Sequence, residues 1–117
     1  MFQRPVPVTL RPASGSLELD LSERPINHSG TVAAANILVA AANKHRTALW
    51  LINASGVDMN VGLGWDAAVG QGILLVASGG AFELNKTNLF KGDIYIIGAS
   101  GTGNVFTCVE LESRYAY

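Results

Sequence analysis

Apolar and polar residues alternate along several short runs of the chain, and this alternation is the main structural signal in it. In the first clear run, LELDL at 17–21, leucines alternate with acidic residues. Successive side chains of a strand point to opposite faces, so this run predicts a half-buried strand. We expect Arg24-Pro25 to end the strand, because proline lacks the backbone donor that a central strand requires.

The stretch from Val32 to Ile52 is compatible with two interpretations. Its alanines would allow a helix over 32–42. The apolar residues at 37–39 are consecutive, however, whereas a helix that faces a core spaces them at three and four. Asn43-Lys44 resembles a turn before a second apolar run at 47–52. We therefore predict two strands joined by a turn. The second includes ALWLI, which is apolar on both faces and so predicts a central strand between packed layers.

Beyond residue 57, short strands recur about every ten residues with glycine-rich turns between them. Over 58–64 we expect apolar side chains to face inward and polar ones outward, that is, Met59, Val61 and Leu63 against Asp58 and Asn60. Further strands are predicted at 73–77, 82–84, 93–97 and 105–112, with turns at 78–80 and 98–104. In the last strand, odd-numbered and even-numbered residues face opposite ways.

This succession of strands, without a convincing helix, is typical of sandwiches and jelly-roll barrels. We therefore predict an all-β protein, with a single-domain antiparallel β-sandwich or jelly-roll-like barrel at 17–117. An extended, proline-rich N-terminal arm at 1–16 precedes it. The chain has 117 residues, which suffices for one domain with one core.

Composition adds the expectation of an assembly. Apolar residues make up 49% of the chain and charged residues only 15%, whereas charged residues are about 25% of a typical soluble domain. A small domain has much surface to cover, so we interpret the shortage of charge as surface hidden against neighbours. The alternative is that alanine and the 13 glycines raise the apolar count without creating an adhesive surface.

Charge and targeting signals exclude several partners. The net charge is −1, with 8 basic and 9 acidic residues. Nucleic-acid binding requires clustered basic residues, and no basic run exists here. The start of the chain has no apolar core of signal-peptide length, and the longest apolar stretch, 37–42, is far short of a membrane span. We expect a protein made in the cytoplasm that binds neither nucleic acid nor membrane.

The run GLGWDAAVGQG at 62–72 contains Gly62-x-Gly64-x-x-Ala67, which fits a permissive dinucleotide-binding fingerprint. That fingerprint requires a helix after the loop, because the helix N-terminus binds the phosphate. An apolar strand follows here instead, so we predict a turn between two strands, with Trp65 covering the end of the barrel or an interface. GASGTGN at 98–104 lacks the lysine of a phosphate loop and is interpreted as a hairpin loop.

Reactive constellations are not evident. His45 falls in a predicted turn and is expected at the solvated surface, and His28 lies beside Ser29 without an acid placed to complete a triad. Cys108, the only cysteine, is expected to be a buried and inert thiol that forms no intrachain disulfide. The aspartates lack calcium-binding spacing; they are Asp58, Asp66 and Asp93. We therefore predict no catalytic, cofactor-binding or metal-binding residues, and not an enzyme.

From Ile37 to Glu112, the order of strands and turns resembles small β-sandwich virion proteins of tailed bacteriophages. The resemblance rests on an Ala-Ala-Asn turn at 41–43 with Arg46 leading the next strand, then VGLG, a Gly-Gly turn, and IYIIGASGTGNV. It implies a structural role, in decorating or cementing the capsid or in a tail or fibre. The N-terminal thirty residues lie outside it.

The function predicted from this resemblance is that of a capsid decoration, or cement, protein in the virion. Such a protein stabilises the head by binding between major capsid proteins, and we expect a homo-oligomer, a trimer. The arm would lie along a neighbour and add backbone hydrogen bonds at an open sheet edge. The predicted partner-binding residues are Phe2, Arg4, Pro5, Pro7, Trp65, Tyr115 and Tyr117.

The alternative function is a tail or fibre module that binds host glycan. Aromatic rings that stack on sugars would be its candidate residues, namely Trp50, Trp65, Tyr95, Tyr115 and Tyr117. We favour the arrangement in which Trp50 belongs to the core and the C-terminal tyrosines pack on a neighbour.

Overall fold

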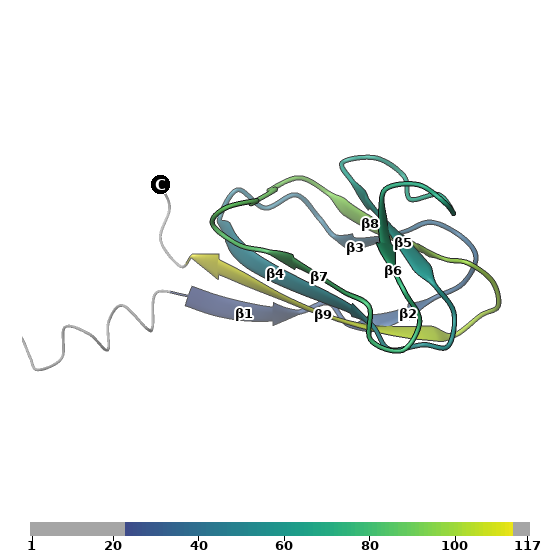
Figure 1. Ribbon diagram of the computed structural model, residues 1–117. Helices are drawn as coiled ribbons and strands as arrows, with labels where there is room; N and C mark the ends of the chain where they lie inside the picture. The colour runs from purple at the N-terminus through teal and green to yellow at the C-terminus, as the bar shows by residue number, and fades with distance from the viewer. Residues whose placement is uncertain (1–22, 114–117) are drawn as a thin grey trace, which may run out of the picture.

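The computed structural model describes residues 23–113, which form two antiparallel sheets without a helix (Figure 1). Sheet A consists, in spatial order, of β1 (Glu23–Asn27), β9 (Asn104–Ser113), β4 (Arg46–Asn53) and β7 (Ala81–Leu84), and β2 (Gly30–Val32) also pairs with β9. Sheet B consists of β3 (Ile37–Ala40), β8 (Ile94–Gly98), β5 (Met59–Leu63) and β6 (Ile73–Leu75). The predicted all-β class is confirmed. No helix within 23–113 is long and apolar enough to cross a membrane.

The core lies between the inner faces of the two sheets. Sheet A contributes mainly Leu49, Leu51, Leu84, Phe106 and Cys108, all of them buried. Sheet B contributes mainly Val39, Met59, Val61, Leu75, Ile94 and Ile96. Burying one large aliphatic side chain stabilises a fold by about 1.5–3 kcal/mol. The alternating runs of the sequence therefore form strands because alternate side chains enter this shared layer.

The stretch with two interpretations forms two strands, as predicted. β3 and β4 belong to different sheets, and a turn at 43–45 connects them. The amide of Arg46 donates to the carbonyl of Asn43 at 3.0 Å, and the amide of His45 donates to Oδ1 of Asn43 at 3.0 Å. This side-chain bond is typical of asparagine in turns, so Asn43 stabilises the turn that directs the chain from β3 to the other sheet.

β4 is a central strand, since it pairs with both β9 and β7, but it does not lie between two packed layers. On its inner side Leu49 and Leu51 are fully buried, whereas on its outer side Trp50 and Ile52 are 38% and 39% exposed. The prediction that both faces would be covered, and that Trp50 would lie in the core, is therefore wrong for residues 23–113. Sheet A packs against sheet B on one side only.

Arg24-Pro25 does not end a strand; both residues lie inside β1. β1 is at the edge of sheet A and pairs with β9 alone. An edge strand tolerates proline because the missing backbone donor can face away from the ladder. The LELDL run at 17–21, the arm at 1–16, and residues 114–117 lie outside the described residues.

Two loops differ from their predicted form. Asn60, expected to face outward, does so but is only 4% exposed, because the loop at 64–72 covers it. The loop at 98–104 is not a hairpin loop, since it leads from β8 in sheet B to β9 in sheet A. The alternation of 58–64 is otherwise as predicted, with Met59 and Val61 fully buried. Alternation in the sequence thus predicted which way each side chain points, but not which segment covers it.

Candidate functional site

The glycine-rich loop at 64–72 joins β5 to β6 within sheet B and contains no helix, so the predicted turn between two strands is confirmed. Its fingerprint amides have acceptors within the protein. The amide of Gly64 donates to the Asp93 carbonyl at 2.8 Å, and the amide of Ala67 donates to Oδ1 of Asn36 at 2.7 Å. A phosphate cradle needs such amides directed at the ligand, and these are directed at the protein.

Glycine is needed at two positions, Gly62 in β5 and Gly72 at the end of the loop, because other backbone atoms approach both closely. A Cβ at position 62 would clash with the backbone oxygen of Trp65, and its next neighbours would be atoms of Ala67. Gly72 has a positive φ of 74°, and a Cβ there would meet the backbone of Val61 and the Trp65 ring. The loop folds back on β5, and glycine at 62 and 72 makes the close approach possible.

A buried ionic network closes one end of the sandwich. Arg46 is fully buried, and its Nε donates to Oε2 of Glu110 at 2.5 Å. The remaining guanidinium nitrogens donate to backbone carbonyls of Ala41, Phe90 and Gly92 at 2.8–3.0 Å. One side chain from β4 thus fixes β9 and two loops, because arginine has five donors in a rigid planar group.

The network continues from Glu110 toward the surface. His28 Nε2 lies 2.8 Å from Oε1 of Glu110, and Nδ2 of Asn43 donates to Oε1 of Glu112 at 2.8 Å. Arg24 donates from Nε to Oε2 of Glu112 at 2.9 Å. The hydrogen bonds from Asn43 and then Arg24 lower the pKa of the Glu112 carboxyl below its ordinary value.

This network does not form a nucleophilic triad. An acid does lie beside His28, contrary to the sequence-based expectation, and it is the buried Glu110. The hydroxyl of Ser29, however, accepts the backbone amide of Cys108 at 2.9 Å, and no bond joins it to His28 among the described residues. His28 and Ser29 lie between β1 and β2, and the Ser29 hydroxyl is directed at the backbone of Cys108, to whose carbonyl it also donates at 3.5 Å. The hydrogen bonds of this network instead connect strands and loops of the fold.

The single thiol has the environment predicted for it. Cys108 is 1% exposed in the middle of β9. Burial, and next the nearby Glu110 charge, raise the pKa of the Cys108 thiol to about 12. Two of the three aspartates considered for calcium binding cap loops: Asp58 accepts the Ala77 amide at 2.9 Å and Asp93 accepts the Ala42 amide at 2.7 Å. Within 23–113 no group of three or more His, Cys, Asp or Glu side chains is placed to hold a metal ion.

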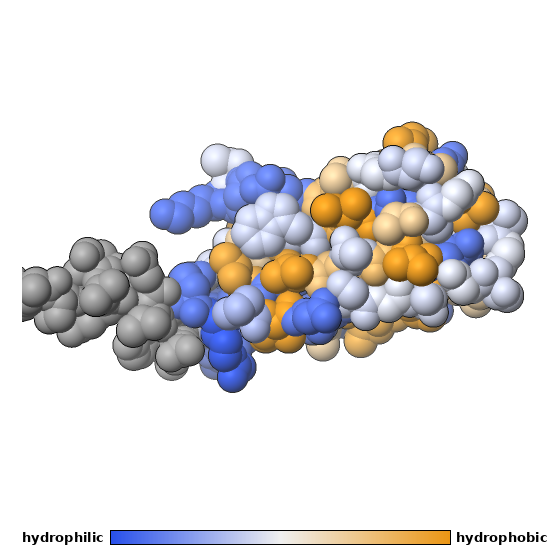
Figure 2. Space-filling model, turned by 90° about the horizontal axis from the view of Figure 1, so that it is seen from below, coloured by the Kyte–Doolittle hydropathy of each residue, from blue (hydrophilic) through white to orange (hydrophobic). Residues whose placement is uncertain are grey.

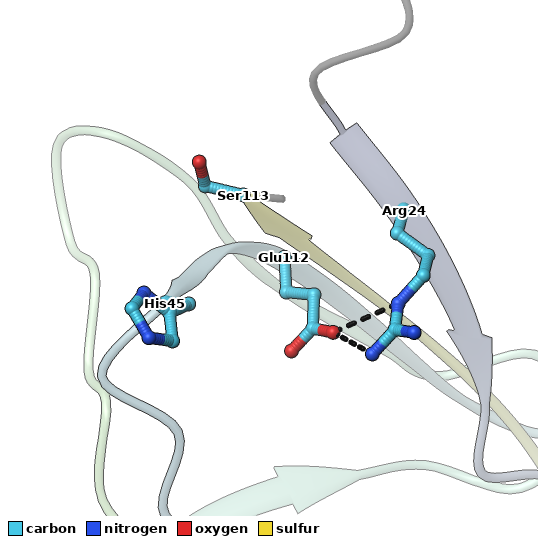
Figure 3. Close-up of a pocket in the computed structure, with 4 residues that line it drawn as sticks. All are labelled: Arg24, His45, Glu112 and Ser113. Carbon is cyan, nitrogen blue, oxygen red and sulfur yellow. Dashed lines mark hydrogen bonds and ion pairs between the residues drawn. The ribbon is translucent and has the colours of Figure 1, made fainter. Parts of the chain in front are cut away.

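A polar pocket of about 400 Å³ lies where β1 and β9 reach the same end of the sandwich (Figure 3). Arg24, His45, Glu112 and Ser113 line it. His45 is half-buried here and not at the fully solvated surface that we predicted, and its Nδ1 is buried without a hydrogen-bond partner among the described residues. Figure 3 shows the Arg24 guanidinium bound to Glu112, so the charges of this pocket largely neutralise one another.

The outer face of sheet A, the side that faces away from sheet B, exposes large apolar side chains. They are Trp50 and Ile52 of β4 and Val105 and Val109 of β9, which are 38–46% exposed. Trp50 and Val109 are directly opposite each other in the β4–β9 pairing. Figure 2 views the molecule from below, the side on which β1 and β9 lie in Figure 1, and shows apolar side chains in groups on this side.

A groove of about 550 Å³ crosses the outer face of sheet A. Its floor is formed by Ala48, Trp50 and Leu111. Glu23 of β1 lies at one end, and Lys86, just after β7, lies at the other. The groove therefore runs across the strands, from the first edge of sheet A to the opposite edge.

The outer face of sheet B is also apolar. Its exposed residues come from the two edge strands, from the loop that covers β5 and from the position just after β6, and they are Leu38, Trp65, Val69, Leu74 and Val76, 45–56% exposed. Between the two edges lies Tyr95, opposite both Leu38 and Gly62 in the strand pairing. Burial, followed by the charge of Asp93, raises the pKa of the Tyr95 hydroxyl. Large exposed apolar areas mark sites of interaction with other molecules.

The predicted partner-binding residues are only partly placed. Trp65 is 45% exposed on the sheet B side, whereas six others lie outside the described residues: Phe2, Arg4, Pro5, Pro7, Tyr115 and Tyr117. Trp50 and Trp65 are both candidates for glycan stacking, but Trp50 lies on β4 of sheet A and Trp65 lies in the loop between β5 and β6 beside sheet B, so they do not form one platform. Sequence reasoning missed Leu38 and Leu74, although each stands at an outward position next to a residue that enters the core.

Comparison of the chain with models of protein families, with curated proteins and with solved structures found no match. We therefore base the function on the fold and on the surfaces of residues 23–113.

Proposed function

We propose that the protein is a structural component of a tailed-bacteriophage virion, a capsid decoration protein that binds between major capsid proteins and stabilises the head. The observation that carries this proposal is the apolar character of both outer faces. Nine large apolar side chains of residues 23–113 are exposed, and they lie on or beside both sheets. Ile52, Val105 and Val109 of sheet A, which do not line its groove, and the apolar residues beside sheet B can contact two neighbours at once, as a cement protein must.

We further infer a jelly-roll topology. In a jelly roll, eight strands alternate between two four-stranded sheets through two Greek keys. If β1 and β2 are counted as one interrupted strand, sheet A joins the first, eighth, third and sixth strands, and sheet B joins the second, seventh, fourth and fifth. This order supports the assignment. Jelly rolls occur in viral capsid proteins and in lectins, so the topology favours a virion role without determining it.

In this proposal, the N-terminal arm at 1–16 adds the contact to the neighbouring subunit. β1 is the edge strand that the arm precedes, and β7 is the opposite edge of sheet A. Edge strands present unpaired backbone groups to which another chain can add a strand. A trimer on the capsid surface would multiply weak contacts of this kind through avidity.

The test is binding to heads. Purified full-length protein should co-sediment with empty capsids of the phage that encodes it, and the failure of this binding overturns the proposal. Deletion of residues 1–12 should lower the copy number per particle and the temperature at which heads release their genome. A Lys44→Ser variant, changed at an exposed turn, serves as the control and should bind like the parent. Unchanged occupancy and release after the deletion would refute the role of the arm alone.

A glycan-binding module of a tail or fibre is the second candidate, and one observation favours it. The ring of Trp50 is exposed in a groove whose far end carries Glu83, Asn85 and Lys86. An aromatic ring beside hydrogen-bonding groups is a common way to bind a sugar. A glycan array separates the two functions, because a decoration protein should bind no glycan, whereas a tail module should lose its glycan on Trp50→Ala.

A further inference from the structure

We propose that residues 17–21, LELDL, cross the outer face of sheet A of their own chain and occupy the groove floored by Ala48, Trp50 and Leu111. This inference concerns the protein by itself and does not rest on the proposed function. Its consequence is that the arm at 1–16 begins near β7 and not beside β1.

The first argument is where the chain enters. The described residues begin at Glu23, and this residue itself lines the groove, where its carboxylate accepts a hydrogen bond from the Thr47 hydroxyl. Twenty-two residues precede Glu23, and only Ser22 separates it from LELDL. A segment attached beside its site has an effective concentration in the millimolar range or above. The chain's own segment is therefore favoured over the same segment of a second copy.

The second argument is length. From β1 to β7 the groove crosses three strand spacings, which is about 14 Å at ~4.8 Å per spacing. Five extended residues span about 17 Å at ~3.4 Å each. Residues 17–21 therefore match the crossing, and Ser22 provides the change of direction.

The third argument is chemical fit. An extended LELDL places all three leucines on one side and Glu18 and Asp20 on the other. The leucines would face the apolar floor, and both carboxylates would remain in water. With residue 21 at the β1 end, Glu18 lies toward Lys86, which has no ion-pair partner among residues 23–113. Glu83 also lines that end, so Lys86 is the group that makes it suitable for an acidic segment.

Disulfide trapping in the full-length chain tests the proposal. The double variant Leu19→Cys, Ala48→Cys should form an intramolecular disulfide when oxidised with diamide, in a yield that does not change on dilution. The native Cys108 is buried and does not compete. The matched control, Leu19→Cys with Leu74→Cys, places the second thiol on sheet B and should form no intramolecular bond. Disulfide-linked dimers in place of the intramolecular bond would assign the groove to a second copy and overturn the proposal, as would no disulfide.

Tryptophan emission gives an independent readout. In a Trp65→Phe background, Trp50 is the only tryptophan. Leu19→Ser should then shift its emission to longer wavelength and increase quenching by acrylamide, whereas Leu19→Met should change neither. Far-UV circular dichroism confirms that each variant is folded. Identical emission of the parent and the Leu19→Ser protein contradicts coverage of Trp50 by this segment.

Discussion

Arg46 donates all of its hydrogen bonds inside the sandwich, to Glu110 and to three backbone carbonyls. Removing one partner of a buried ion pair leaves an uncompensated charge, which typically costs about 3–5 kcal/mol. We therefore expect Arg46→Leu to lower the free energy of unfolding by about this amount. Urea denaturation followed by circular dichroism measures the change.

Arg24 provides the matched control. It is the other arginine that binds a carboxylate of β9, but its side chain is 60% exposed. Exposed ion pairs contribute little because water and salt screen them. Arg24→Leu should therefore leave the urea midpoint almost unchanged. If the two substitutions lowered the urea midpoint equally, burial would not explain the contribution of Arg46 to stability.

The chemistry of Cys108 follows from its burial. With the thiol pKa raised to about 12, almost no thiolate exists in the native state at pH 8. We expect Ellman's reagent to leave the native protein unmodified and to modify one thiol per chain in urea. Because the folded pKa lies above the unfolded one, the thiol's contribution to stability is complete below the unfolded pKa. It is lost as the pH rises toward 12. Rapid labelling of the native protein contradicts this account.

Sequence reasoning could place these residues on a face but could not pair them. Alternation along 105–112 puts Glu110 on the same side as Cys108, which is the buried side. An acid at that position requires a partner, yet nothing in the sequence indicates that the partner is Arg46, 64 residues away. Pairing depends on strand register, and register is a property of the whole sheet.

At the scale of elements, local signals predicted most strands and turns. The consecutive apolar residues before Asn43 predicted a strand–turn–strand unit, and β3 and β4 form it. Pro25 misled the prediction, because proline is excluded only from strands with neighbours on both sides, and the sequence does not show that β1 is an edge. The sequence also does not show which strands pair. For this reason the loop at 98–104 was predicted to be a hairpin loop, although it connects the two sheets.

The glycine-rich loop yields a prediction at this scale. A methyl group at position 62 would clash with the Trp65 backbone and force the loop away from β5. Overpacking of this kind typically costs about 1–3 kcal/mol. We expect Gly62→Ala to reduce the free energy of unfolding by that amount and to increase hydrogen exchange at the Gly70 amide, which donates to Asn60.

Gly56→Ala is the control, since a Cβ at position 56 has no atom within 4 Å. It should be neutral or slightly stabilising, because alanine has less freedom than glycine in the unfolded chain. If Gly62→Ala proved as harmless as Gly56→Ala, the loop would not be held against β5 by close packing.

At the scale of the whole molecule, the sequence predicted hidden surface from composition but not where that surface lies. The low charged fraction suggested an assembly, and the structure locates the apolar residues on two opposite outer faces. It also shows that several of the few charged side chains are gathered into the network around Glu110. Arg46 and Glu110 are buried and therefore add no charge to the outer faces, and only the three-dimensional arrangement reveals this.

The two faces predict self-association, and the face of sheet B offers the sharper test. Leu38 and Leu74 are 49% and 55% exposed on its two edge strands, so replacing them with serine removes apolar surface without opening the core. If the parent is a trimer, its mass in solution is three times 12.3 kDa. Leu38→Ser with Leu74→Ser should reduce this toward the monomer mass at an unchanged circular dichroism spectrum. Light scattering at several concentrations measures it, with Lys44→Ser as the control. A parent that is monomeric at every concentration, or a double variant that assembles like the parent, contradicts an interface on this face.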